Sequence, residues 1–201
     1  MNKFKPVPRS FFKKDTFTIA KELLGMKLEK KTRDGILSGI IVETEAYHGD
    51  HDPACHAYGR VTERNKILFG PPGNVYVYFI YGNYFCFNIT TEKKGVGAAV
   101  LIRGVMPVEG IEIMQSLRGE KVKRHDLTNG PSKFCMAFDI DKSINGDSIY
   151  DSDIKLLIPV KKEEHETAIS KRIGLTIGTE FEYRYFIKGN PYVTKHKFNK
   201  I

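Results

Sequence analysis

The segment from Ile67 to Thr91 constrains the fold more than any other part of this chain. Its 25 residues carry no charged side chain, and a helix of that length could cross a membrane. Turn-forming residues interrupt it, however: Pro71, Pro72, Gly73, Asn74, Gly82, Asn83 and Asn88. Val75 to Ile80 and Tyr84 to Ile89 are β-branched and aromatic runs on either side of Gly82-Asn83. This pattern predicts a β-hairpin and excludes a membrane span.

The rest of the chain mixes helical and extended patterns. Residues 15–24 combine a capping aspartate with an apolar stripe and predict a helix. Residues 28–31 and 36–44 flank a turn sequence and predict a second hairpin. We further expect a strand over 98–105, helices over 108–117 and 131–138, and short strands within 154–187. Separate helices and antiparallel hairpins indicate an α+β fold.

The domain count and the environment follow from length, charge and cysteine content. The 201 residues contain no linker-like segment, so we expect a single domain over 1–201 with a flexible basic stretch at 1–10. The net charge of +8 is concentrated at the two ends of the chain. Such a surface attracts nucleic acid, although it also fits a lysine-rich surface that only maintains solubility. Three cysteines and no secretory signal favour the cytoplasm.

Two carboxylates lie near the end of the extended segment 36–44. Glu43 and Glu45 are two positions apart, so a strand places them on one face. A carboxylate beside a loop can act as a general base or position a water molecule. Considered alone, the two glutamates are better explained as solvated residues at a sheet edge, or as partners of a lysine in a salt bridge, than as catalytic groups.

The polar segment that follows contains His48, His51, Cys55 and His56. These residue types bind zinc, but their spacing matches no standard ligand pair. Cys55 and His56 could also form a nucleophile and its base, although adjacent side chains usually point in different directions. A polar loop with exposed histidines is the simplest interpretation, and metal analysis of the purified protein would test the zinc hypothesis.

The predicted aromatic hairpin carries a third set of candidates. Strand alternation places Tyr76 and Tyr78 on one face. Phe79 and Tyr81 then share the other face. One face can pack in a core, and the other can present rings to a flat ligand, because stacking contributes about 1–3 kcal/mol per base. Tyr81 precedes Gly82-Asn83, so we expect it at the hairpin tip.

Taken together, these segments closely resemble the alkyladenine (3-methyladenine) DNA glycosylase family, the purine glycosylases of base excision repair. The similarity extends from the first predicted helix to Thr194, and motifs this long and this ordered are specific. The matching stretches are IVETEAYHGDHDPACHAYGR, TERNKILFGPPGNVYVYFIYGNYFCFNIT, AVLIRGVMPVEGIEIM, LTNGPSKFCMAFDI, the Arg172-Ile173-Gly174 step and RYFIKGNPYVT.

The resemblance implies a catalytic group and a base pocket. The glutamate of the Glu-Ala-Tyr step deprotonates the attacking water in the family, which implies Glu45 as the base. Arg103 and the backbone carbonyl of Ile173 would help to hold that water. Aromatic and imidazole faces would cover the extruded base, an asparagine would crowd the purine 2-position, and backbone groups would contact the 6-position. The implied pocket residues are Tyr47, Ala54, His56, Tyr78 and Asn88.

The resemblance also implies how DNA is bound. Tyr81 would insert where the nucleotide has left the duplex, and Arg60 and Arg64 would contact phosphates. The implied fold is one compact mixed domain around a curved antiparallel sheet with a protruding aromatic hairpin. The family needs no metal and no cofactor, and we expect a monomer. Its substrate would be double-stranded DNA with damaged purines of the 3-methyladenine, 7-methylguanine, hypoxanthine and ethenoadenine class.

A non-catalytic nucleic-acid-binding module is the alternative, since it could use the same aromatic hairpin and basic ends. Glu45 separates the two hypotheses, because pure binding does not need a carboxylate that repels the phosphate backbone. His48, His51 and Cys55 receive no role from the resemblance. In a bacterium, a DNA glycosylase of the cytoplasm would be associated with the nucleoid.

The expected position of Tyr81 gives a prediction that separates a wedge from a core residue. Tyr81→Ala should leave the melting temperature nearly unchanged, because an exposed ring loses little packing. Excision from a paired duplex should fall sharply, and excision of a poorly paired lesion should fall less, since its extrusion costs less. Melting curves and excision rates on both substrates test this. A core residue would instead lose about 3–5 kcal/mol of stability.

Overall fold

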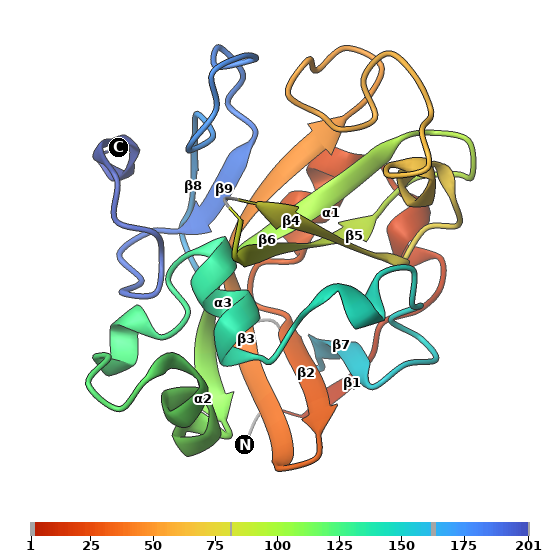
Figure 1. The fold of residues 1–201 in the computed structure, drawn as a ribbon. Helices are drawn as coiled ribbons and strands as arrows, with labels where there is room; N and C mark the ends of the chain where they lie inside the picture. The colour runs from red at the N-terminus through yellow and green to blue at the C-terminus, as the bar shows by residue number, and fades with distance from the viewer. Residues whose placement is uncertain (1–2, 81, 162–163, 201) are drawn as a thin grey trace.

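A single antiparallel sheet organises the structure (Figure 1). The computed structural model describes all residues except 1–2, 81, 162–163 and 201. Within this described part, the strand order is β1-β7-β2-β3-β6-β5-β4, with β9 beside β3 and β8 beside β9. The strands are β1 (Phe4–Pro6), β2 (Lys27–Thr32), β3 (Gly35–His48), β4 (Val75–Ile80), β5 (Tyr84–Thr90), β6 (Ala98–Glu109), β7 (Ile154–Pro159), β8 (Thr167–Ser170) and β9 (Arg184–Ile187).

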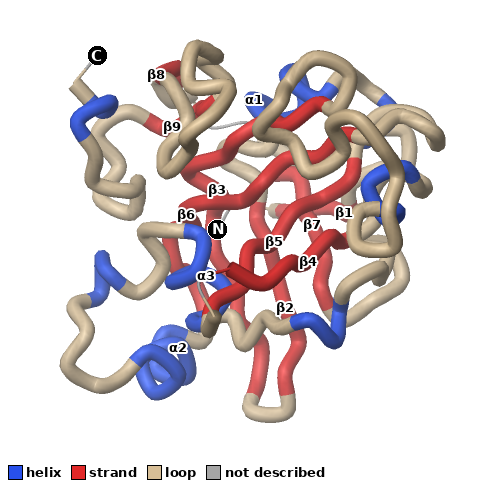
Figure 2. Tube along the Cα trace, turned by 45° about the horizontal axis from the view of Figure 1, so that its top comes forward, coloured by secondary structure: helices blue, strands red, loops and turns tan. Residues whose placement is uncertain are grey.

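Three α-helices in the described residues accompany the sheet: α1 (Thr16–Glu22), α2 (Ile111–Arg118) and α3 (Pro131–Ala137). Figure 2 shows α2 and α3 on the same side of the molecule, at the lower left. None of the helices in this part of the chain has the length and apolarity needed to cross a membrane. The predicted α+β class is confirmed, and so is the antiparallel sheet.

Most of the predicted elements are present because their signals are local. α1 begins after Asp15, whose carboxylate accepts a hydrogen bond of 2.9 Å from the Thr18 amide. This is the capping interaction that satisfies a free amide of the first turn. The two predicted hairpins are β2–β3 and β4–β5. Pro131 opens α3, where its missing N–H costs nothing.

The boundary between β6 and α2 differs from the prediction. The helix expected over 108–117 begins only at Ile111, and the strand expected to end at Val105 continues to Glu109. Pairing with β3 keeps this segment extended, because Glu109 still lies opposite Ser38. Gly110, with φ of 74°, then turns the chain into the helix. Tertiary pairing therefore overrides the helical periodicity of residues 108–110.

The long strand β3 changes its partner along its length, and this positions the site. Its first half pairs with β2, whereas Glu43 to Glu45 pair with β9 on the same edge. Its other edge pairs with β6 throughout. As β3 advances by one residue from Glu43 to Thr44, β6 passes from Gly104 to Ile102, so Arg103 is the extra residue of a bulge. Bulges redirect side chains, and here the bulge faces a pair of carboxylates.

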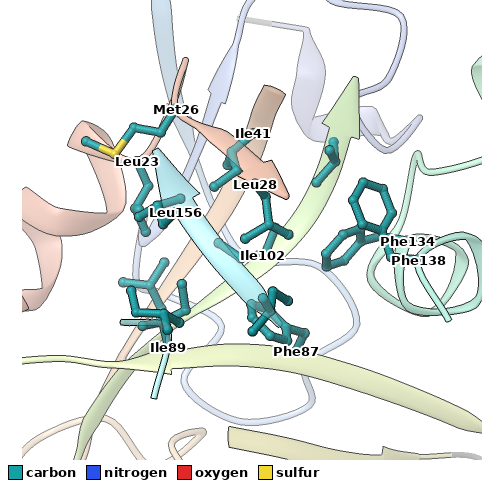
Figure 3. Close-up of a cluster of buried hydrophobic side chains, with 14 of the residues drawn as sticks. Leu23, Met26, Leu28, Ile41, Phe87, Ile89, Ile102, Phe134, Phe138 and Leu156 are labelled. Carbon is teal, nitrogen blue, oxygen red and sulfur yellow. The ribbon is translucent and has the colours of Figure 1, made fainter. Parts of the chain in front are cut away.

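The main core lies between the sheet and the helices α1 and α3 (Figure 3). The rings of Phe134 in α3 and of Phe138, the residue that follows α3, are 4.8 Å apart, and the ring of Phe87 in β5 lies 5.9 Å from that of Phe134. Val75 and Val77 of β4 point into this core. The alternate residues of β4 therefore face away from it, so the hairpin has one core face and one face free to line a site.

Leu156 of β7 provides a test of this packing. It is 1% exposed and lies in the core, so Leu156→Ala should lower the free energy of unfolding by about 2–5 kcal/mol. Val160 lies just after the same strand and is 61% exposed, so Val160→Ala serves as the control and should change stability little. Urea unfolding curves measure both. Equal stability of the two variants would contradict the packing described here.

Candidate active site

Two buried glutamates and a buried arginine form the polar centre of the molecule. Glu43 and Glu45 are fully buried, and Arg103 is 5% exposed. Arg103 donates from Nε to Glu43 at 3.1 Å and from Nη1 to Glu45 at 3.2 Å. The two carboxylates thus share one guanidinium, as expected for residues on the same strand face. The bulge at Arg103 directs this side chain between them.

Glu43 belongs to a network that closes on the C-terminal segment. It accepts a bond of 2.6 Å from Arg184 Nε and two bonds from Thr194, 2.8 Å from the amide and 2.7 Å from the hydroxyl. The interpretation of Glu43 as a solvated edge residue or a lysine partner is therefore wrong. Burial acts to raise the pKa of Glu43, but the charges of Arg103 and Arg184 and the Thr194 bonds outweigh it and hold this pKa below its ordinary value.

Glu45 is held by three donors. Oε2 accepts from the Tyr47 hydroxyl at 2.8 Å and from Arg103, whereas Oε1 accepts from the Ile173 amide at 2.8 Å. The structure thus brings the three residues predicted for the catalytic group, Glu45, Arg103 and Ile173, into direct contact. The observed contact of Ile173 is made by its N–H group. An ionised carboxylate has about four acceptor positions, so one position on Oε1 receives no hydrogen bond from the described residues.

A pocket of about 300 Å³ opens beside this carboxylate. Tyr47 lines it and also donates to Glu45, so the pocket and the carboxylate share a wall. All five residues predicted for the base pocket are among its lining residues, which are Tyr47, Ala54, Cys55, His56, Leu68, Tyr76, Tyr78, Asn88 and Ala99. This volume includes space open to solvent, and aromatic rings form much of the lining. The pocket therefore suits a small, flat and mostly apolar ligand.

The pocket walls are fixed by side-chain contacts. Tyr76 is opposite Asn88 in the hairpin, and its hydroxyl lies 3.0 Å from His56 Nδ1. The Asn88 amide donates to the Tyr76 carbonyl at 3.1 Å. The rings of His56 and Tyr78 meet edge to face at 4.4 Å. Strand alternation placed Tyr76 and Tyr78 on one face, but only the structure identifies Tyr76 as a residue that joins two walls.

The pKa shifts of the side chains that line the pocket favour their neutral forms. Burial, followed by the positive charge of Arg64, lowers the pKa of His56. Burial also raises the pKa of Tyr78 and, to about 12, that of Cys55. The pocket therefore presents uncharged side chains around neutral pH.

The backbone amide of Ala54 is one of the predicted contacts to the base. In this structure it donates a hydrogen bond to Asp52 at 3.1 Å.

The residues of the zinc and thiol hypotheses lie in different surroundings. His48 Nε2 lies 3.2 Å from Glu92 and its ring stacks on His51 at 5.1 Å. Cys55 Sγ contacts the Gly97 carbonyl, whereas His56 Nδ1 lies 3.0 Å from the Tyr76 hydroxyl, so the two side chains have different hydrogen-bond partners. Across residues 3–80, 82–161 and 164–200, no three histidine, cysteine or acidic side chains are grouped to hold a metal ion.

The predicted DNA contacts divide into two cases. Arg60 and Arg64 are exposed and border a second hollow of about 480 Å³, which shares His56 and Tyr76 with the pocket. Tyr81 lies outside the described residues. Phe79, which precedes it by two positions, is 49% exposed.

Comparison with known proteins gives a consistent result. The family model described as "Methylpurine-DNA glycosylase (MPG)" matches residues 10–191. A protein of Carboxydothermus hydrogenoformans is 44% identical over 192 residues, covering 94% of this chain and 98% of its own. A protein of Clostridium perfringens (strain 13 / Type A) is 44% identical over 204 residues, covering 93% and 98%. Both carry the name "Putative 3-methyladenine DNA glycosylase".

The buried network at Glu43 predicts a pH-dependent stability. Glu43→Gln should lower the free energy of unfolding at pH 7 by about 3–5 kcal/mol, because two buried arginines lose a charged partner. The folded pKa of Glu43 lies below its ordinary value of 4.5. Its contribution is therefore complete above that value and is lost as the pH falls through the folded pKa. The difference between wild type and variant should shrink in acid.

Urea unfolding at pH 7 and at about pH 3.5 measures this difference. Glu120→Gln is the matched control, since Glu120 is exposed and its substitution should change neither value. A Glu43→Gln variant as stable as the wild type at pH 7 would contradict the assigned network.

Proposed function

Because the chain belongs to the methylpurine-DNA glycosylase family, we propose that it hydrolyses the N-glycosidic bond of damaged purines in double-stranded DNA. The substrates would be alkylated or deaminated purines of the 3-methyladenine, 7-methylguanine, hypoxanthine and ethenoadenine class. One observation carries the proposal: a buried carboxylate, which keeps an acceptor position open among the described residues, shares a wall with an aromatic pocket. The protein would act as a monomer in the cytoplasm, at the nucleoid in a bacterium.

The nucleotide must leave the duplex before this site can reach it. A glycosidic bond inside a duplex is not accessible, and extrusion costs a few kcal/mol. Stacking on Tyr47, Tyr78 and His56 would offset that cost, and insertion of Tyr81 would fill the gap in the duplex. Arg60 and Arg64, together with the basic ends of the chain, would supply attraction to phosphate.

Hydrolysis would use a water molecule on the free position of Glu45 Oε1. Arg103 and the backbone at Ile173 would fix its direction, and Glu45 would accept its proton as the oxygen attacks C1′. An alkylated purine is cationic and departs readily, so positioning of water is the main requirement. A neutral purine such as hypoxanthine would also need protonation to depart, and we propose N7 as the site.

Specificity would come from the pocket walls. Asn88 lies opposite Tyr76 on the hairpin and is held by the Tyr76 carbonyl, so it cannot move away from a bulky 2-substituent. Guanine carries an amino group at that position, and the wall would disfavour it. Backbone groups near Ala54 and His56 would contact the purine 6-position.

Duplexes that carry each lesion test the proposal directly. The wild type should release the base, so that alkali cleaves the strand at the lesion. Glu45→Gln should bind the lesion duplex but lose excision by about 10²–10⁴-fold, because the amide cannot accept a proton. Absence of excision on all four lesions would refute the proposed function. Near-normal turnover by the variant would transfer the role of the base to another group.

The same reactions report whether the enzyme is monofunctional. The residue at the proposed catalytic position is a carboxylate and not an amine, so borohydride should trap no covalent protein–DNA adduct. A trapped adduct on a lysine would exclude the water mechanism.

A further inference from the structure

The guanidinium of Arg172 donates four hydrogen bonds to groups outside the catalytic group. Its side chain and that of Asp52 are fully buried and form a two-bond ion pair, 2.5 Å from Nη1 and 2.7 Å from Nη2. Nη1 also donates to the Ala46 carbonyl at 3.0 Å, and Nη2 donates to the Gly178 carbonyl at 3.3 Å. Neither residue of this pair has a role in the proposed chemistry.

One side of this guanidinium is connected to the carboxylate. Ala46, whose carbonyl it binds, lies between Glu45 and Tyr47 in β3. The guanidinium carbon lies 4.4 Å from the centre of the Tyr47 ring, and that tyrosine donates to Glu45. The residue after Arg172 is Ile173, whose amide donates to Glu45. Arg172 therefore fixes two of the three groups that hold the Glu45 carboxylate.

The other side is connected to the pocket. Asp52 Oδ1 accepts from the Ala54 amide, and the Asp52 carbonyl accepts from the Cys55 amide at 2.9 Å. These bonds fix the turn that carries Ala54, Cys55 and His56 into the pocket wall. The fit against the chain after Arg172 is close as well, since a Cβ at Gly178 would lie 3.0 Å from Asp52 Oδ1.

We propose that the Arg172–Asp52 pair is a positioning device that holds the base pocket at a fixed distance and angle from Glu45. This rests on the proposed glycosylase function and names residues that serve it without contacting the substrate. A base in the pocket and a water on Glu45 react only if the pocket wall and the Glu45 carboxylate keep their relative position. A displacement of about 1 Å can lower the rate by about 10²-fold. The planar fork of arginine binds two carboxylate oxygens and two carbonyls at once, which lysine cannot do.

Two variants test the pair. Arg172→Lys keeps the charge and removes the fork. Arg172→Met/Asp52→Leu removes both charges, and replacing a buried ion pair with apolar residues usually leaves a protein folded and stable. In single-turnover excision at saturating enzyme, we expect both variants to lose about 10²-fold in rate. Their affinity for lesion duplex should change much less, because the aromatic walls and the phosphate contacts remain.

Leu156→Ala is the control for loss of stability, since Leu156 lies in the main core on β7. Assayed well below its melting temperature, it should excise at the wild-type rate. A wild-type rate in the folded double variant would overturn the proposal. So would an equal loss of rate in Leu156→Ala, since reduced stability alone would then explain the effect. A wild type that excises no lesion would refute the glycosylase function instead, so the two failures are distinguishable.

Discussion

The buried guanidinium of Arg103 between Glu43 and Glu45 is the interaction on which the site depends. Burying two carboxylates is unfavourable unless a positive charge lies close to both. One arginine can reach both only because β6 carries an extra residue at this point, which turns Arg103 toward β3. The two glutamates then differ in their remaining partners. Glu43 is saturated by Arg184 and Thr194, whereas Glu45 keeps a free acceptor position.

This difference separates a structural carboxylate from a reactive one. Both residues lie on one strand, and both are fully buried. Glu43 receives donors from the C-terminal segment and is closed off from any ligand. Glu45 receives a hydroxyl that belongs to the pocket wall, so a ligand in the pocket comes close to its carboxylate. Environment, rather than residue type, therefore distinguishes the proposed base from its neighbour.

The sequence allowed the local elements to be predicted, because their signals are local. Asp15 caps α1, and Gly82-Asn83 separates two strands, whatever the rest of the chain does. The resemblance supplied residues of the site, and the structure brings Glu45, Arg103 and Ile173 together. Long-range partners could not be predicted. Arg172 and Asp52 are 120 positions apart and look like ordinary surface charges in the sequence, as do Arg184 and Glu43, which are 141 apart.

Those distant pairs explain why the site requires nearly the whole chain. The proposed base lies on β3, near the N-terminal end of the sequence, but its neighbours come from β6, from Ile173 and, through Glu43, from Arg184 and Thr194. Each contact is a hydrogen bond from a charged, hydroxyl or backbone donor to a buried carboxylate, so its loss would leave that carboxylate partly unsatisfied. An incomplete site would therefore lower the stability of the folded state. Folding and assembly of the site are in this way the same event, and the carboxylate is buried only when its complete set of donors is in place.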